Sequence, residues 1–149
     1  MRAKKPLVIL ALILVGMFLL TACGKESLED KTVLFEAVST NASEVGLQSD
    51  FVVKSTYTVY TDGTLTHIDT YSKSGDKTFK NTKLSQKALD LLNEYLDGDF
   101  KKYTENYNGI DELKWKMTHY NEDGTVSHEF KGYAYGNVTL QNIITIVAK

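Results

Sequence analysis

Two stretches of alternating apolar and polar residues, each interrupted by an Asp-Gly pair, stand out along the chain. They are TVYTDGTLTHIDTY at 58–71 and THYNEDGTVSHEFKGY at 118–133. Alternation is typical of a strand with one buried face, and glycine accepts the positive φ that a tight turn requires. The pattern therefore predicts two β-hairpins, and the alignment of the two Asp-Gly pairs predicts that they belong to an internal repeat.

The alternation also predicts which side chains share a face of each hairpin, because a shift of one residue would turn the aromatic side chains outward. In the second hairpin, pairing Tyr120 with Thr125 groups Trp115, Met117 and His119 with Val126, His128 and Phe130. In the first hairpin, a glycine bulge at Gly63 groups Phe51, Val53, Tyr57 and Val59 with Leu65, His67 and Tyr71.

A helical pattern follows each hairpin. Residues 85–97 have a possible N-cap at Ser85, apolar residues at helical spacing, and Gly98 as a stop. The last segment repeats this spacing from a possible N-cap at Thr139 onward. Its many β-branched residues leave a strand as the alternative there.

The order of these elements predicts the fold class. The segment TVLFEAVST at 32–40 reads as one more strand, at an edge of the sheet, which gives the order β-ββα-ββα. This order predicts an α+β fold in which two helices pack on one face of an antiparallel sheet. The ββα units would span about 51–98 and 113–149, within a single domain at 33–149.

The first 22 residues have the layout of a secretory signal. Arg2, Lys4 and Lys5 come before any acidic residue, and residues 7–20 are all apolar or glycine. This run is shorter than the ~20 residues that a membrane-spanning helix needs. A cleaved signal peptide at 1–22 is therefore favoured over a retained anchor.

The single cysteine ends this apolar segment. Leu20-Thr21-Ala22-Cys23 resembles the lipobox of bacterial lipoproteins. The resemblance implies a diacylglyceryl group on the sulfur of Cys23, with fatty chains of the palmitate type, and cleavage just before that residue. A free thiol and an intermolecular disulfide are the alternatives. Several acyl chains anchor durably, since each buried methylene contributes about 0.8 kcal/mol. We therefore expect residues 23–32 to tether the domain to the extracellular face of a Gram-positive-type cell membrane.

The charge of the chain after the signal bears on its partners. All 19 acidic residues but only 14 of the 17 basic residues follow the signal, so the mature chain carries a net charge of −5. Binding to nucleic acid requires a basic surface, which this balance does not supply. The expected partners are the membrane, through the lipid, and a protein, peptide or cell-wall ligand.

Candidate chemistry is sparse in the sequence. A G-x-S-x-G elbow, an H-E-x-x-H helix and a phosphate-binding loop are all absent, so the chain is not predicted to be an enzyme. His67, His119 and His128 share a face in the predicted hairpins, which leaves a zinc site as the alternative to core histidines. The acidic stretches at 97–99 and 106–112 lack calcium-binding spacing and read as solvated turns. No metal or cofactor is expected.

Tyrosines and lysines on the opposite face of the predicted sheet form a candidate binding surface. Its residues are Tyr60, Tyr120, Lys114, Lys116, Tyr133 and Tyr135. Tyrosine combines a large apolar area with a hydroxyl group, which suits recognition. Cross-strand pairs on a half-exposed sheet are the alternative explanation.

A lysine-rich segment at 72–83 offers a second surface. It contains Lys73, Lys77, Lys80 and Lys83 and reads as a solvated loop. Contact with anionic lipid or wall polymer is the alternative for this segment.

Taken together, the lipobox and the repeated hairpin-helix units resemble small surface lipoproteins of Gram-positive bacteria. YTVYTDGTLT, the helix at 85–97, WKMTHYNEDGTVSHEF and the last helix also resemble, in their order, emfourin-like inhibitors of thermolysin-type metallopeptidases. We expect a non-enzymatic, membrane-tethered binding module. An inhibitor of a secreted metallopeptidase is the alternative, and an uncharacterised hydrolase is the third option.

Overall fold

The computed structural model describes residues 28–41, 49–75, 77–107 and 113–148. The predicted signal peptide and Cys23 lie outside these residues. The chain divides before Thr32 into two units, and the short 3-10 helix η1 (Leu28–Asp30) is the described element of the first unit. No described helix is both long enough and apolar enough to cross a membrane.

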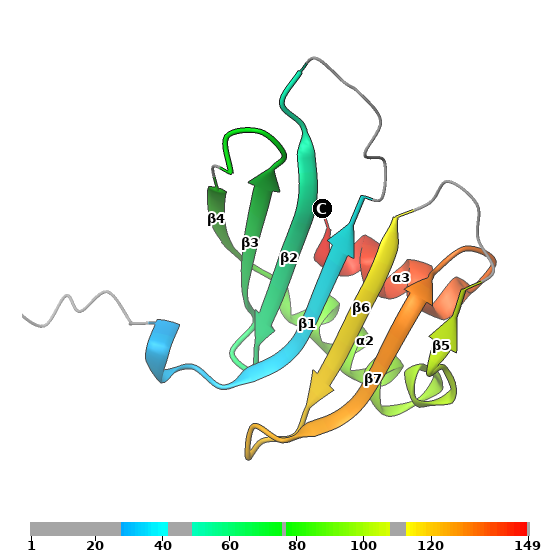
Figure 1. The fold of residues 1–149 in the computed structure, drawn as a ribbon. Coiled ribbons are helices and arrows are strands. Elements are labelled where there is room, and N and C mark those ends of the chain that lie inside the picture. The colour runs from blue at the N-terminus through cyan, green and yellow to red at the C-terminus, as the bar shows by residue number, and fades with distance from the viewer. Residues whose placement is uncertain (1–27, 42–48, 76, 108–112, 149) are drawn as a thin grey trace, which may run out of the picture. The chain divides into compact units, whose positions relative to one another are not determined.

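Seven strands of the second unit form one mixed sheet (Figure 1). In spatial order they are β4 (Lys77–Lys83), β3 (Thr64–Tyr71), β2 (Val52–Tyr60), β1 (Val33–Thr40), β6 (Lys114–Tyr120), β7 (Val126–Tyr133) and β5 (Glu105–Asn106). Neighbouring strands are antiparallel except for β5 and β7, which are parallel.

The predicted fold class is therefore wrong, since the sheet is neither wholly antiparallel nor built from two ββα units. Residues 77–83, predicted as a solvated loop, form strand β4 along β3. Every residue of β4 is exposed, so this strand lacks the apolar alternation that reveals a strand in sequence. Lysine is common on edge strands because its charge discourages pairing with another chain. With β4 in place, a three-stranded meander, rather than a hairpin, precedes the first helix.

Strand β1 lies at the centre of the sheet and not at the predicted edge. It pairs with β2 on one side and with β6 on the other. Phe35 and Ala37 of this strand are completely buried. The alternation of the sequence predicts the buried face of β1, but it carries no information about which strands lie beside it.

Both predicted hairpins are present, but β-bulges shift the strand registers within them. In the second hairpin His119 pairs with His128 and Tyr120 with Val126, so the predicted pairing of Tyr120 with Thr125 is wrong. Because Val126 is 56% exposed, it does not belong to the buried group that the sequence predicts for this hairpin. In the first hairpin Tyr57 pairs with His67, and a bulge follows Val52. The other predicted members of each buried group are described below where they contribute to the site.

The helices are α2 (Gln86–Asp97) and α3 (Val138–Val147), and both lie on the same side of the sheet (Figure 1). Ser85 is confirmed as the N-cap of α2, because its hydroxyl accepts a hydrogen bond from the N–H of Ala88. The predicted cap of α3 is wrong, since the side chain of Asn137 accepts from the N–H of Leu140. The strand alternative for this segment is also wrong.

The core fills the space between the sheet and the helices. Its completely or almost completely buried side chains include Phe35, Val59, Met117 and Phe130 of the sheet and Leu92, Leu96, Leu140, Ile143 and Val147 of the helices. Burying a side chain of this size contributes about 1.5–3 kcal/mol. Phe100, in the 3-10 helix η2 (Asp99–Lys102), packs edge-on against Phe35 at 6.0 Å between ring centroids. This packing fixes the inner face of the sheet relative to both helices.

Gly132 generates a prediction about the short parallel strand. Its φ is +136°, and a Cβ built on it would lie 1.8 Å from the backbone oxygen of Asn106 in β5. We expect Gly132→Ala to lower the free energy of unfolding by about 2 kcal/mol or more, because β5 must move away. Denaturant unfolding measures this loss. Gly75→Ala is the control, since Gly75 also has a positive φ but no atom near the added Cβ. Equal losses in the two variants would contradict the close approach of β5.

Candidate functional site

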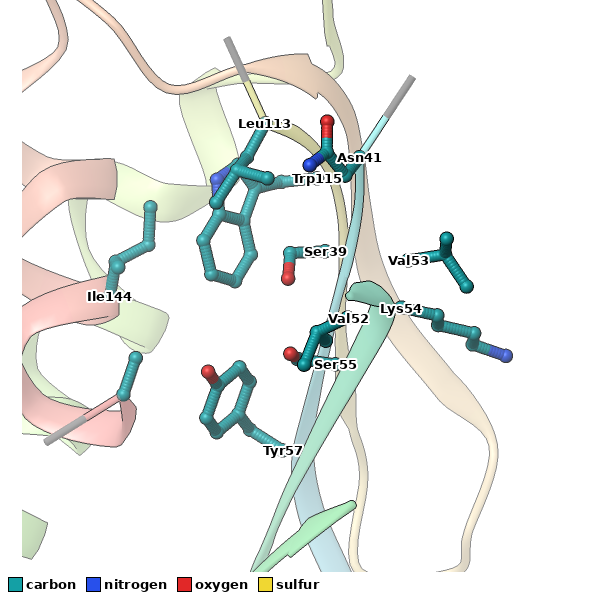
Figure 2. Close-up of a pocket in the computed structure, with 11 residues that line it drawn as sticks. Ser39, Asn41, Val52, Val53, Lys54, Ser55, Tyr57, Leu113, Trp115 and Ile144 are labelled. Atoms are coloured by element: carbon teal, nitrogen blue, oxygen red, sulfur yellow. The ribbon is translucent and has the colours of Figure 1, made fainter. Parts of the chain in front are cut away.

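A pocket of about 390 Å³ lies between the inner face of the sheet and the C-terminal end of α3 (Figure 2). The strands β1, β2 and β6 and the loops next to them contribute Ser39, Asn41, Val52, Val53, Lys54, Ser55, Tyr57, Leu113 and Trp115, and α3 and its C-cap contribute Ile144 and Ala148. Pockets that bind small molecules typically have volumes of about 300–1,000 Å³. The space is therefore large enough for a small ligand.

The hollow exists because small side chains occupy the inner face at this end of the sheet. Ser39 of β1 is the register partner of Ser55 on β2 and of Trp115 on β6. The inward residue before Ser39 on β1 is Ala37, which is completely buried in the core. The hydroxyl of Ser39 points into the space between Trp115 and Tyr57 and is too short to fill it (Figure 2).

Two aromatic side chains form the wall of the pocket. The rings of Tyr57 and Trp115 are 6.2 Å apart between centroids, with an angle of 28° between their planes. Tyr57 also stacks on His67, at 4.3 Å between centroids and 19° between planes. Both aromatic residues project from strands inside the sheet. The backbone pairing of these strands therefore holds the wall in place without a ligand.

A polar network lies behind this wall. The Ser55 hydroxyl donates a hydrogen bond of 2.5 Å to Oδ1 of Asp69. Nε2 of His67 lies 2.8 Å from the same oxygen. Since a carboxylate oxygen only accepts, this histidine nitrogen donates. The side chains of His67 and Asp69 are 20% and 16% exposed, respectively. The network holds the Ser55 hydroxyl and the His67 ring, on which Tyr57 stacks, in fixed orientations.

The same network affects the phenol of Tyr57. Burial raises the pKa of Tyr57, hydrogen bonding with Ser55 lowers it, and the negative charge of Asp69 raises it further. The net shift is upward. Tyr57 therefore presents a neutral hydroxyl to the pocket at neutral pH.

A serine, a histidine and an aspartate meet here, but their order does not fit nucleophilic catalysis. A general base must accept the proton of the nucleophile, and an acid then orients the base. In this structure Ser55 donates its proton to Asp69, and His67 donates to the same oxygen. This arrangement gives no support to the hydrolase alternative.

The three histidines share the inner face, but they do not form a metal site. Within the described ranges, no group of three or more His, Cys, Asp and Glu side chains could hold a metal ion. Nε2 of His128 donates to the backbone oxygen of Tyr103 at 2.7 Å. His119, the register partner of His128, is 8% exposed, and its Nδ1 has no hydrogen-bond partner. His119 and His128 are therefore neighbours, whereas His67, on another strand, bonds to Asp69.

Of the two acidic stretches considered as calcium sites, the first forms ion pairs and the second lies mostly outside the described residues. Asp97 pairs with Lys101, and Asp99 pairs with Lys102. Most of the second stretch, residues 108–112, lies outside the described residues.

The predicted tyrosine and lysine surface does not form a single patch. Tyr60 and Tyr120 lie at one end of the sheet, with the start of β1 between their strands. Lys114 and its register partner Tyr133 lie at the other end of β6, about 20 Å from Tyr120 at the rise of an extended strand. Between them, Lys116 pairs with Glu129 at 3.0 Å. Any partner of the whole set must therefore span the sheet.

The two remaining predicted surface elements are also placed by the structure. Tyr135 follows the end of β7 and is 68% exposed. The lysines at 77, 80 and 83 lie on edge strand β4.

The sequence did not predict the pocket. The signal that could have revealed it is the pair of inward serines, Ser39 and Ser55, at positions where the alternation of β1 and β2 calls for apolar residues.

Three comparisons were made, with models of protein families, with curated proteins and with solved structures. No match to this chain was found in any of them.

The environment of His119 predicts a pH dependence of stability. The pKa of His119 is lowered, mainly because the ring is buried. The charge of Asp97 raises this pKa, while Lys101 and His128 lower it further. The unfolded chain therefore binds this proton more readily than the folded chain. The stability that neutral His119 contributes to the fold is fully present above a pH of about 6.5, the pKa of histidine in the unfolded chain. This stability is lost as the pH falls below that value.

We expect His119→Phe to reduce the stability lost between about pH 7 and pH 5, where an unperturbed histidine titrates. Chemical denaturation at several pH values measures the difference between the variant and the unaltered chain. An identical pH dependence of the two proteins would show that His119 does not resist protonation in the fold.

Proposed function

We propose that this chain is an extracellular lipoprotein, anchored to the cell membrane through Cys23, that acts as a non-enzymatic binding module. Its ligand site is the pocket between β1, β2, β6 and α3. The single observation that carries this proposal is a hollow of about 390 Å³ with aromatic walls and a few hydroxyl groups. Apolar walls with a small number of placed polar groups are characteristic of small-molecule sites.

The position of the site on regular elements supports binding. Trp115 is 7% exposed and packs with the core, so its ring is ordered before any ligand arrives. Tyr57 is held from behind by its stack on His67. A preformed wall lowers the entropy that a ligand must overcome on binding. Rigid binding walls and an unactivated serine together favour recognition over catalysis.

The lipid anchor supports the proposed location. The lipobox resemblance implies a lipid on Cys23, and in the sequence nine residues, 24–32, stand between Cys23 and the first strand of the sheet. Nine residues extend no further than about 30 Å. The pocket would therefore act on ligands near the membrane surface or in the adjoining wall.

The pocket can be tested by filling it. Trp115 is the single tryptophan of the chain, so its fluorescence reports on the pocket without interference from other tryptophans. We expect some phenyl-, indolyl- or alkyl-bearing fragments to change this fluorescence in a saturable way. Ser39→Phe should weaken their binding by about tenfold or more, because the added ring occupies the hollow.

The matched control for this variant is Thr40→Phe, which adds the same ring to the next residue of β1, on the opposite face. Thr40 is exposed, so this ring leaves the pocket open. Fragment binding that survives Ser39→Phe unchanged would place the ligand site elsewhere.

The anchor has a separate test in the native host. The protein should fractionate with membranes and have a mass greater than that of the bare polypeptide 23–149. A Cys23→Ser variant should lack this added mass, because no sulfur is available for acylation. Wild-type protein that retains residues 1–22, or that has the mass of the unmodified polypeptide, would contradict the anchor.

A further inference from the structure

We infer that the pocket selects an organic ammonium ion, that is, a protonated amine carrying a small apolar body. This inference rests on the proposed function and specifies the ligand class. Four features of the pocket point to a positively charged head group, and they come from different parts of the fold.

The first feature is the hydrogen-bonding capacity of Ser55. Its one proton is donated to Asp69 at 2.5 Å. A hydroxyl group has one proton and two lone pairs, so the lone pairs of Ser55 remain for a donor on the ligand. An ammonium group supplies donors, whereas a carboxylate or phosphate does not.

The second feature is the charge of Asp69. Its carboxylate lies directly behind Ser55, and its side chain is 16% exposed. Charges in a partly buried setting interact more strongly than charges in water. Nε2 of His67 donates to the oxygen that also accepts from Ser55, so the second carboxylate oxygen takes no part in these two hydrogen bonds. The charge of Asp69 attracts a cation at the polar end of the pocket and repels an anion.

The third feature is the end of α3. Ala148, the C-cap of this helix, lines the pocket. The last carbonyl groups of a helix lack partners within the helix and carry partial negative charge, which favours a cation. Within the described residues, the last turn of α3 contains no basic residue.

The fourth feature is the aromatic wall. The faces of tryptophan and tyrosine rings attract cations within about 6 Å of the ring centre. Of the described residues that line the pocket, only Lys54 is charged, and its side chain points away from Trp115 and Tyr57 (Figure 2). The described lining of the pocket therefore contains acceptors and π faces, with no cationic side chain directed toward Trp115 and Tyr57, and the carboxylate of Asp69 lies behind it.

Three probes with a common phenylethyl body separate head-group charge from apolar fit. They are 2-phenylethylammonium, 2-phenylethanol and 3-phenylpropanoate, titrated against the acylated full-length mature chain in zwitterionic bicelles. Fluorescence of Trp115 reports binding, and Ser39→Phe gives the background. We expect the ammonium ion to bind at least about tenfold more tightly than the alcohol, and the carboxylate to bind more weakly than the alcohol.

The variant Asp69→Asn removes the charge and keeps an acceptor for Ser55. It should reduce the advantage of the ammonium ion over the alcohol to about threefold, because the aromatic wall and the helix end remain. Asp90→Asn removes an exposed carboxylate on α2 and should leave the ratio unchanged. If circular dichroism shows that Asp69→Asn does not fold, the ratio in the unaltered chain still decides the matter.

The outcomes distinguish this inference from the proposed function. Equal binding of the ammonium ion and the alcohol, or tighter binding of the carboxylate, would overturn the inference and leave the pocket as a binding site. A ratio unaffected by Asp69→Asn in a folded protein would also overturn the role of that charge. If none of the three probes binds above the Ser39→Phe background, both the inference and the pocket as ligand site are rejected.

Discussion

The inner face of β1 is the feature on which the rest of this structure depends. Successive inward residues of this strand are Phe35, Ala37 and Ser39, so one large aromatic side chain is followed by two small ones, the last of them polar. At Phe35 the sheet and the helices meet in a close-packed core, with Phe35 itself completely buried. At Ser39 the same face continues, but the side chain no longer fills the distance to α3. One alternating strand thus produces both the core and the pocket.

The electrostatic character of the pocket follows from this placement. The register of β2 on β1 puts Ser55 beside Ser39, and the register of β3 on β2 puts Asp69 beside Ser55. The carboxylate therefore lies one strand away from the cavity and acts through a hydroxyl group. On the other side, the C-terminal end of α3 adds partial negative charge. Because these contributions come from fixed backbone elements, the preference for a cation does not require side chains to rearrange.

Much of the local structure was predictable from the sequence, whereas its assembly was not. Asp-Gly pairs between alternating residues marked both hairpins, and Ser85 marked the start of α2. Strand β4 was missed because its residues are polar throughout, as befits an edge. The central position of β1 was missed because strand neighbours are a long-range property. The pocket depends on three strands and a helix that are distant in sequence, so the inward serines Ser39 and Ser55 can indicate a gap in the core but not which elements enclose it. The predicted tyrosine surface belongs to the opposite face, where Tyr60 and Tyr120 lie at one end of the sheet and Tyr133 lies at the other.

The central claim is that ligand recognition takes place on the inner face, at Ser39, and not on the outer tyrosine-bearing face. Nuclear magnetic resonance of the isotope-labelled mature chain, titrated with 2-phenylethylammonium, tests this most directly. The account predicts saturable shifts of the Trp115 indole and of the signals of Ser39, Tyr57 and Ile144, while Tyr60 and Tyr120 stay unchanged. Shifts concentrated at Tyr60 and Tyr120, with the Trp115 indole unaffected, would contradict it.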